Sequence, residues 1–174
     1  MQPVFTIGHS NRSWNDFISL LLNNHVNILV DVRRYPQFNR EEMAKQFCRW
    51  DPELKIVGLR LSNVMSPEDY ARFPDFQDDA RKRKWNVWSY IDARDAAQAF
   101  RLALEADLKG AEVFIIANAD TVMLRDNKGL LAEVFPDVPQ NSSFGPNDSL
   151  FSIEKARQVM KYEPKYSWRT QQTK

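Results

Sequence analysis

Cysteine is almost absent from this chain, since Cys48 is the only one among 174 residues. A single thiol excludes an internal disulfide and a cysteine metal cluster. Its position beside the apolar residues of a predicted helix favours a buried, inert side chain over a nucleophile. The two histidines, His9 and His25, are too far apart in the sequence to indicate a metal site, so no metal is expected.

The chain also lacks a large excess of either basic or acidic residues, and it lacks a long apolar run. The chain has 24 basic and 23 acidic residues, a net charge of +1, which gives no argument for binding nucleic acid or an anionic membrane. The short apolar run Val4–Ile7 is interrupted by Thr6, so it is neither a signal peptide nor a membrane span. We therefore expect a cytoplasmic protein.

The chain does have enough apolar residues for a core, 43% of the total, and strand and helix patterns alternate along it. Strands are predicted at 4–7, 28–32, 55–61 and 112–117, and helices at 13–22, 41–50, 92–107, 129–135 and 153–160. This alternation predicts a single α/β domain over residues 1–174, with helices on both faces of a mainly parallel sheet.

The apolar residues of each predicted helix mark the face that should pack on the sheet. They are Trp14, Phe17, Ile18, Leu21 and Leu22 in the first helix, Met43, Phe47 and Trp50 in the second, and Ala97, Phe100 and Leu104 in the third. Asp92 or Asp95 can cap the third helix. Residues 65–86 interrupt the alternation as a long polar and aromatic excursion with two prolines.

Three motifs near the N-terminus occur in a specific order and spacing. They are Thr6–Ser13 (TIGHSNRS), Val30–Arg33 (VDVR) and Pro36–Asn39 (PQFN). Residues 1–40 thereby resemble the start of the domain-of-unknown-function family four-eight-eight. Later segments of that family are not recognisable in this chain.

The chain from Glu41 onward carries a different set of motifs. They lie in Glu41–Phe47, Gly58–Met65, Trp88–Ala97, Leu150–Arg157 and Tyr162–Arg169. Residues 41–174 thereby resemble the C-terminal half of an extended short-chain dehydrogenase of the NAD-dependent epimerase/dehydratase type. This resemblance implies a Rossmann-like fold, and the two resemblances together indicate a chimera, natural or constructed, joined near residue 40.

Two motifs of the resembling epimerases are absent. Their Gly-x-x-Gly-x-x-Gly turn brings the backbone close to the pyrophosphate of NAD, but in Gly8–Trp14 only the first glycine is present, and Asn11 and Trp14 replace the others. No tyrosine is followed four residues later by lysine, so the family's Tyr-x-x-x-Lys acid–base pair is missing as well. We expect no bound NAD and no intact catalytic activity.

Three other functions stay open at this stage. The chain could be a weak binding module for a nucleotide or sugar phosphate. It could be an NAD-dependent epimerase/dehydratase-related enzyme in which the N-terminal segment supplies a new anion site. It could also be an assembly protein that forms a homodimer through epimerase-like helices.

The candidate anion site lies where the first two predicted strands end. Gly8, His9, Ser10, Asn11 and Arg33 would meet there at the carboxyl edge of the sheet, beside a helix N-terminus that favours anions. The alternative is that the serines and Asn11 only cap the helix and that an arginine pairs with Asp31. A hydrolase with Ser10 as nucleophile and His9 as base is disfavoured, because adjacent strand residues point apart.

The epimerase resemblance adds Asn63, Tyr90 and Arg94 as candidate substrate contacts. The alternatives are a turn residue for Asn63, core packing for Tyr90, and a helix-surface ion pair for Arg94. The basic run Arg81–Lys84, followed by Trp85 and Trp88, could form a basic and aromatic patch for a diphosphate or for nucleic acid. The preceding Asp78 and Asp79 weaken the nucleic-acid interpretation, and a solvated charged loop is the favoured alternative.

Overall fold

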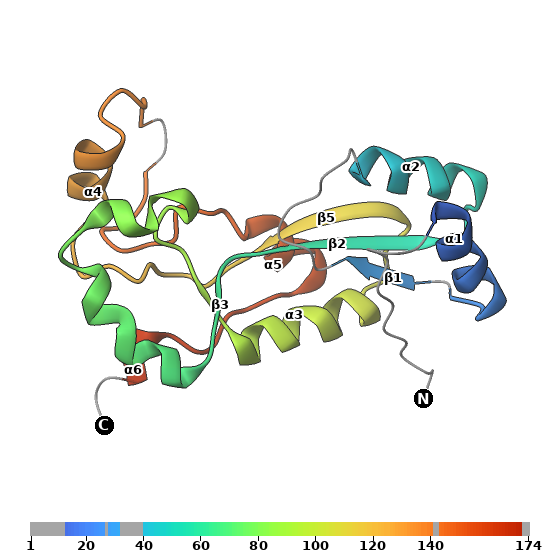
Figure 1. Ribbon diagram of the computed structural model, residues 1–174, viewed down its shortest axis with the longest axis horizontal. Helices are drawn as coiled ribbons and strands as arrows, with labels where there is room; N and C mark the ends of the chain where they lie inside the picture. The colour runs from blue at the N-terminus through green and yellow to red at the C-terminus, as the bar shows by residue number, and fades with distance from the viewer. Residues whose placement is uncertain (1–12, 27, 32–39, 141–142, 172–174) are drawn as a thin grey trace.

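The computed structural model describes residues 13–26, 28–31, 40–140 and 143–171 (Figure 1). Its main sheet contains three parallel strands in the order β1–β2–β5. They are β1 (Ile28–Asp31), β2 (Lys55–Leu61) and β5 (Gly110–Ile116). Together with the helices around it, this parallel sheet confirms the predicted α/β, Rossmann-like fold class. The strand predicted at 4–7 lies outside the described residues.

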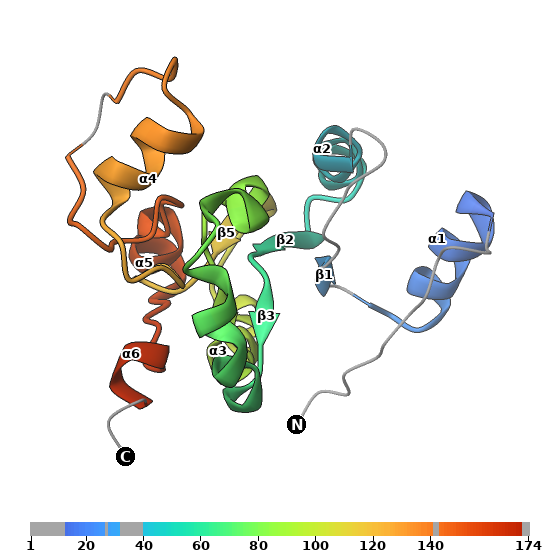
Figure 2. The same ribbon diagram turned by 60° about the vertical axis from the view of Figure 1, so that its left-hand side comes forward.

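Helices lie on both faces of this sheet, as predicted. Helix α2 (Arg40–Trp50) covers one face, while α3 (Ala93–Glu105) and α5 (Glu154–Met160) cover the other (Figure 2). The alternation of side chains along β2 explains this arrangement. Arg60 points to α2, where it pairs with Glu41 at 3.3 Å, whereas Leu59 is buried in the same core cluster as Ala99 of α3. The molecule therefore has three layers.

Local sequence signals set the helix ends. Helix α1 (Trp14–Asn23) begins at Ser13, whose hydroxyl accepts the Asp16 N–H at 3.2 Å and donates to the Asp16 carboxylate at 2.6 Å. Helix α3 begins at Asp92, one of the two predicted caps. No helix in the described ranges is both long and apolar enough to cross a membrane.

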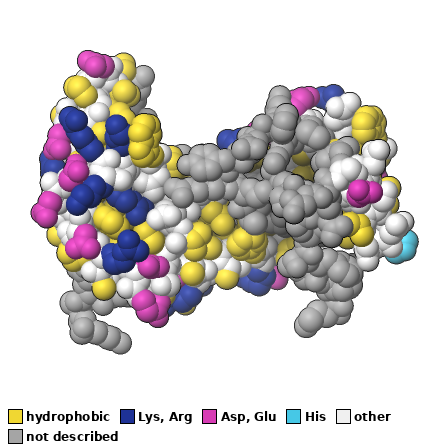
Figure 3. All heavy atoms as spheres, viewed as in Figure 1, with side chains coloured by type: hydrophobic (Ala, Val, Ile, Leu, Met, Phe, Trp, Pro, Cys, Tyr) yellow, Lys and Arg dark blue, Asp and Glu magenta, His cyan; other side chains and the backbone are white. Residues whose placement is uncertain are grey.

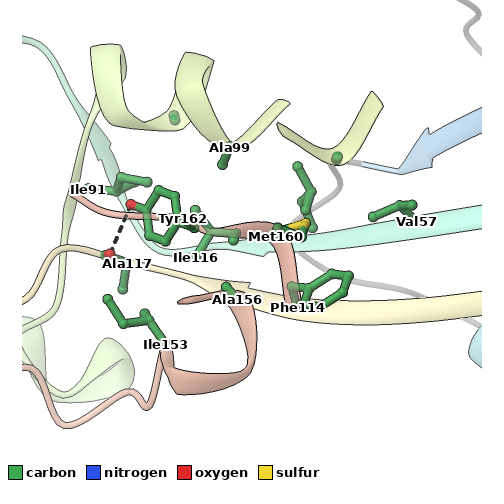
Figure 4. Close-up of a cluster of buried hydrophobic side chains, with 13 residues drawn as sticks. Val57, Ile91, Ala99, Phe114, Ile116, Ala117, Ile153, Ala156, Met160 and Tyr162 are labelled. Atoms are coloured by element: carbon green, nitrogen blue, oxygen red, sulfur yellow. Dashed lines mark hydrogen bonds between the residues drawn. The ribbon is translucent and has the colours of Figure 1, made fainter. Parts of the chain in front are cut away.

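The packing face of α3 is shifted by one residue from the predicted one. Ala96, Ala99 and Ala103 are buried in the core cluster, where Ala99 points to the sheet (Figure 4). Ala97, predicted to face inward, is exposed. Phe100 packs only at the flank of the cluster. Small alanines let the helix approach the strands closely, so the bulkier residues are displaced to its sides.

For two other residues, the prediction that they belong to the core is wrong. Leu22 of α1 is 65% exposed and Trp50 of α2 is 69% exposed. Trp50 lies in the last turn of α2 and makes an edge-on contact with Phe47, with ring centres 5.4 Å apart. On the predicted face of α1, Phe17 is buried, whereas Ile18 and Leu21 are half-buried.

The excursion at 65–86 forms a second body of structure beyond the end of the main sheet. It contains β3 (Val64–Met65) and two 3-10 helices, η1 (Pro67–Phe76) and η2 (Ala80–Asn86). Strand β3 pairs in parallel with β4 (Ile91–Asp92). A second buried cluster, called here the aromatic cluster, joins these elements to α4 (Asn127–Val134) and α6 (Trp168–Gln171); it includes Tyr70, Phe73, Trp88, Tyr90 and Trp168.

Candidate functional site

The carboxyl ends of β2 and β5 meet at one edge of the molecule, where parallel sheets bind ligands. Backbone hydrogen bonds connect the segments that follow them. The Ile91 N–H donates to the Asn63 carbonyl at 3.0 Å, and the Asn118 N–H donates to the Tyr90 carbonyl at 2.7 Å. The segments that follow β2 and β5 are thereby joined to the segment that contains β4, and this region is the candidate site.

Asp92 is the centre of the site. It caps α3 by accepting the Arg94 N–H at 2.8 Å, and its carboxylate also accepts hydrogen bonds from the Arg94 side chain and the Tyr70 hydroxyl. The Asp92 side chain is fully buried. Burial alone would raise the pKa of this carboxyl, but the bonds from Arg94 and Tyr70 together hold that pKa below its usual range. Asp92 is therefore a buried, ionised carboxylate.

Arg94 forms a two-pronged pair with this carboxylate. Its Nε and Nη2 each donate at 2.8 Å, and its side chain keeps 40% of its surface exposed. The guanidinium carbon lies 3.7 Å from the centre of the Tyr166 ring. The hydrogen bonds to Asp92 raise the pKa of Arg94, so the cation is permanent. The pair is neutral as a whole, which weakens its attraction for an anion.

Tyr90 is completely buried in the aromatic cluster. Its hydroxyl donates to Asp120 at 2.8 Å and accepts the Trp168 N–H at 3.1 Å. Burial and the nearby Asp120 charge both raise the pKa of this phenol well above its ordinary value. Tyr90 therefore stays protonated at neutral pH and cannot act as a general base there.

Asp95 accepts hydrogen bonds from the main chain, whereas Asp92 accepts them from side chains as well. It is fully buried on the first turn of α3 and accepts the Lys165 N–H at 3.0 Å and the Tyr166 N–H at 2.9 Å. Burial raises the pKa of Asp95 above its ordinary value, although these two N–H groups act in the opposite direction. Its role in the structure is to fix the segment after α5 to the site.

Among the residues expected to bind a ligand, the structure places Asn63, Tyr90 and Arg94 in this one region. Tyr90 and Arg94 are bonded to carboxylates of the fold. Asn63 is partly exposed, and within the described residues its amide makes one weak contact, with Nδ2 3.7 Å from the Met65 sulfur. The anion-site candidates Gly8, His9, Ser10, Asn11 and Arg33 lie outside the described residues.

The basic run falls on η2, and its two tryptophans have different roles. Trp85 is 86% exposed, with the Lys84 ammonium 4.5 Å from its ring centre. Trp88 is fully buried, and its Nε1 donates to the Ala80 carbonyl at 2.7 Å. Basic and acidic side chains are interspersed over the η1–η2 end of the surface (Figure 3). A patch that uses both tryptophans is therefore excluded.

Sequence reasoning missed several residues of the site as functional candidates: Tyr70, Asp95, Asp120 and Tyr166. The only local signal was that Asp92 and Asp95 resemble helix caps. Cys48, predicted to be buried, is half-buried in the structure, and burial raises the pKa of its thiol. Within the described ranges, no group of three or more His, Cys, Asp or Glu side chains is placed to hold a metal ion.

No family model matches the chain, and no curated protein matches it. The solved structures that are similar to it at low identity include two sugar-nucleotide epimerases. The UDP-N-acetylglucosamine 4-epimerase from Bacillus cereus is 15% identical with a TM-score of 0.48, over 86% of this chain and 65% of that enzyme. The ADP-L-glycero-D-manno-heptose-6-epimerase of Helicobacter pylori is 14% identical with a TM-score of 0.45, over 90% of this chain and 61% of that enzyme. The chain thus spans less than two thirds of either enzyme.

Proposed function

We propose that this chain is an α/β module related to nucleotide-sugar epimerases that has no catalytic activity of its own. The observation that carries the proposal is the internal use of Tyr90 and Arg94. Both were expected to contact a substrate, and both are bonded to carboxylates of the fold, at Asp120 and Asp92. Because both side chains are hydrogen-bonded within the fold, neither is left as a free acid or base for catalysis.

We also propose an ancestry and a cellular location for the chain. Residues 1–40 come from a separate ancestor, and residues 41–174 keep the substrate-side half of an epimerase without its glycine turn or its Tyr-x-x-x-Lys pair. The protein works in the cytoplasm without NAD, nucleic acid or membrane as partners.

Binding of NAD tests this proposal directly. A ligand at about 100 times its dissociation constant stabilises a protein by about 2.7 kcal/mol. We expect no saturable shift in melting temperature with micromolar NAD, and no interconversion of UDP-sugars followed by NMR. A saturable shift accompanied by turnover would replace the proposal with an NAD-dependent epimerase.

A second candidate function is weak binding of a nucleotide or sugar phosphate. Asn63 favours it, because this amide lies at the carboxyl end of β2, is partly exposed and makes only one weak contact within the described part of the chain. The ligand would reach from Asn63 to the predicted anion site that includes Arg33. A charge-assisted hydrogen bond from Arg33 would contribute about 1.5–3 kcal/mol.

Matched arginine variants test this second function with UDP and inorganic phosphate as probes. Arg33→Ala should weaken binding about tenfold or more without unfolding the protein. Arg101→Ala is the control, since Arg101 lies on the surface of α3 and pairs with Glu105. Equal affinities of the two variants would rule out a site at Arg33.

A further inference from the structure

Strand β5 is an edge of the main sheet in the described part of the chain, because it pairs with β2 on one side only. The Ile116 carbonyl accepts the Ser62 N–H at 2.9 Å, so it points to the β2 side. Successive peptide groups of a strand point to opposite sides, so the carbonyls of Val113 and Ile115 point to the free side. A row of such groups is a template on which another strand can pair.

The free edge of β5 has the composition of a strand that associates. Its seven residues, Gly110–Ile116, include one charged side chain, Glu112. The Ile115 side chain is 36% exposed, and Val159 of the adjacent helix α5 is 43% exposed. Segments of this length with high β propensity and low charge pair readily edge to edge. An edge that meets its own copy across a twofold axis is self-complementary, so a second β5 is the occupant that this edge fits.

Lys155 of α5 covers part of this edge. Helix α5 lies beside β5, on the side away from β2 (Figures 2 and 4). The Lys155 ammonium donates to the Val113 carbonyl at 3.0 Å and to the Glu112 carboxylate at 2.7 Å. It also lies 4.9 Å from the centre of the Phe114 ring. The ammonium thereby occupies one of the outward carbonyls and pairs with the charged side chain of the strand.

We propose that Lys155 keeps the free edge of β5 from pairing with β5 of a second copy. A strand that pairs at Val113 must displace the ammonium from the carbonyl and separate it from Glu112. A twofold dimer also brings two such ammonium groups to one interface, where like charges repel. The Lys155 side chain keeps 55% of its surface exposed, so its charge stands at the surface that a second copy would approach.

Three full-length variants test this role. Lys155→Met removes the ammonium, Lys155→Arg keeps the positive charge, and Lys128→Met makes the same substitution on the exposed surface of α4. Light scattering after size exclusion, over a dilution series, should show the dimer association constant of Lys155→Met raised about tenfold or more. Lys155→Arg and Lys128→Met should match the unchanged protein. Equal association of the two methionine variants overturns the proposal.

A second substitution identifies the surface through which Lys155→Met associates. Ile115→Lys returns a positive charge to the same edge, so the double variant should be monomeric again. The N–H groups of Val113 and Ile115 lie on the free side of β5, and their hydrogen exchange should become about tenfold slower in the Lys155→Met dimer. Association that persists in the double variant, or unaltered exchange at these two amides, would show another interface and refute the proposal.

Discussion

The guanidinium of Arg94 stacks on the ring of Tyr166, 3.7 Å from its centre. Arg94 belongs to the first turn of α3, and Tyr166 belongs to the segment between α5 and α6. The contact joins two segments that are distant in the sequence at the carboxyl edge of the sheet. Because Arg94 also pairs with the buried Asp92, loss of this one side chain would affect both contacts.

Arg94→Ala should lower the free energy of unfolding by about 2 kcal/mol, because it leaves a buried carboxylate without its cation. Because Arg94 is 40% exposed, solvent screens part of its interaction with Asp92 and limits the loss. The control Arg101→Ala removes an exposed pair with Glu105 and should change stability by less than about 0.5 kcal/mol. Urea denaturation at neutral pH measures both.

The effect of Arg94→Ala should also depend on pH. The folded-state pKa of Asp92 lies below its ordinary value, so this group stabilises the fold above an ordinary pKa of about 3.9 and loses that contribution as the pH falls through the folded pKa. The difference between native protein and variant should therefore shrink in acid. A difference that is constant from neutral to acidic pH would show that the charge of Asp92 is not involved.

Asp95→Ala should free two backbone amides in the segment between α5 and α6. Hydrogen exchange at Lys165 and Tyr166 should become about tenfold faster, since both N–H groups lose their acceptor. Asp126→Ala, which removes the cap of α4, is a matched control that should leave these amides unchanged. Unaltered exchange in Asp95→Ala would mean that other contacts hold the segment between α5 and α6 in place.

The pH dependence through Asp95 has the opposite sign from that of Asp92. Its pKa is raised in the folded state, so the folded protein holds this proton more tightly than the unfolded chain does. The stabilisation is present below the ordinary pKa and is lost as the pH rises through the raised folded value. Asp95→Asn should remove this loss, which stability measurements across the acidic range can follow.

Thr121→Val should stabilise the protein by about 1 kcal/mol. Thr121 is fully buried, and its hydroxyl has no hydrogen-bond partner in the described part of the chain. Tyr162→Phe is the contrasting change, because that buried hydroxyl donates to the Ala117 carbonyl, and its loss should destabilise by about 1 kcal/mol. Thermal unfolding of both variants should give shifts of opposite sign, and a loss of stability in Thr121→Val would point to a bound water at its hydroxyl.

Deletion of residues 1–40 should leave an unfolded or aggregating remainder if the chain is one cooperative domain. β1 pairs with β2 along Ile28–Asp31, so the deletion leaves one side of β2 unpaired. Light scattering and circular dichroism measure the outcome. A monomeric fragment as stable as the whole chain would show that residues 41–174 fold independently.

Sequence periodicity located the three strands of the main sheet and helices α1 to α5, but not β3, β4, η1, η2 or α6. Strand β2 has the bounds predicted from its apolar run, Lys55–Leu61, and α3 begins at one of the two aspartates predicted as its cap. These features depend on neighbours a few residues away, so their signals are local. The parallel α/β arrangement followed from the alternation of such elements.

Only the tertiary structure decided which face of α3 is buried and which polar groups meet at the site. Ala99 lies inside and Phe100 at the flank because the distance between helix and sheet, set by the whole core, favours a small side chain there. Asp95 meets Tyr166 only when α5 and the segment 161–170 that follows it are in place. Such contacts join residues that no local pattern connects, and they include the bonds of Tyr90 to Asp120 and of Tyr70 to Asp92.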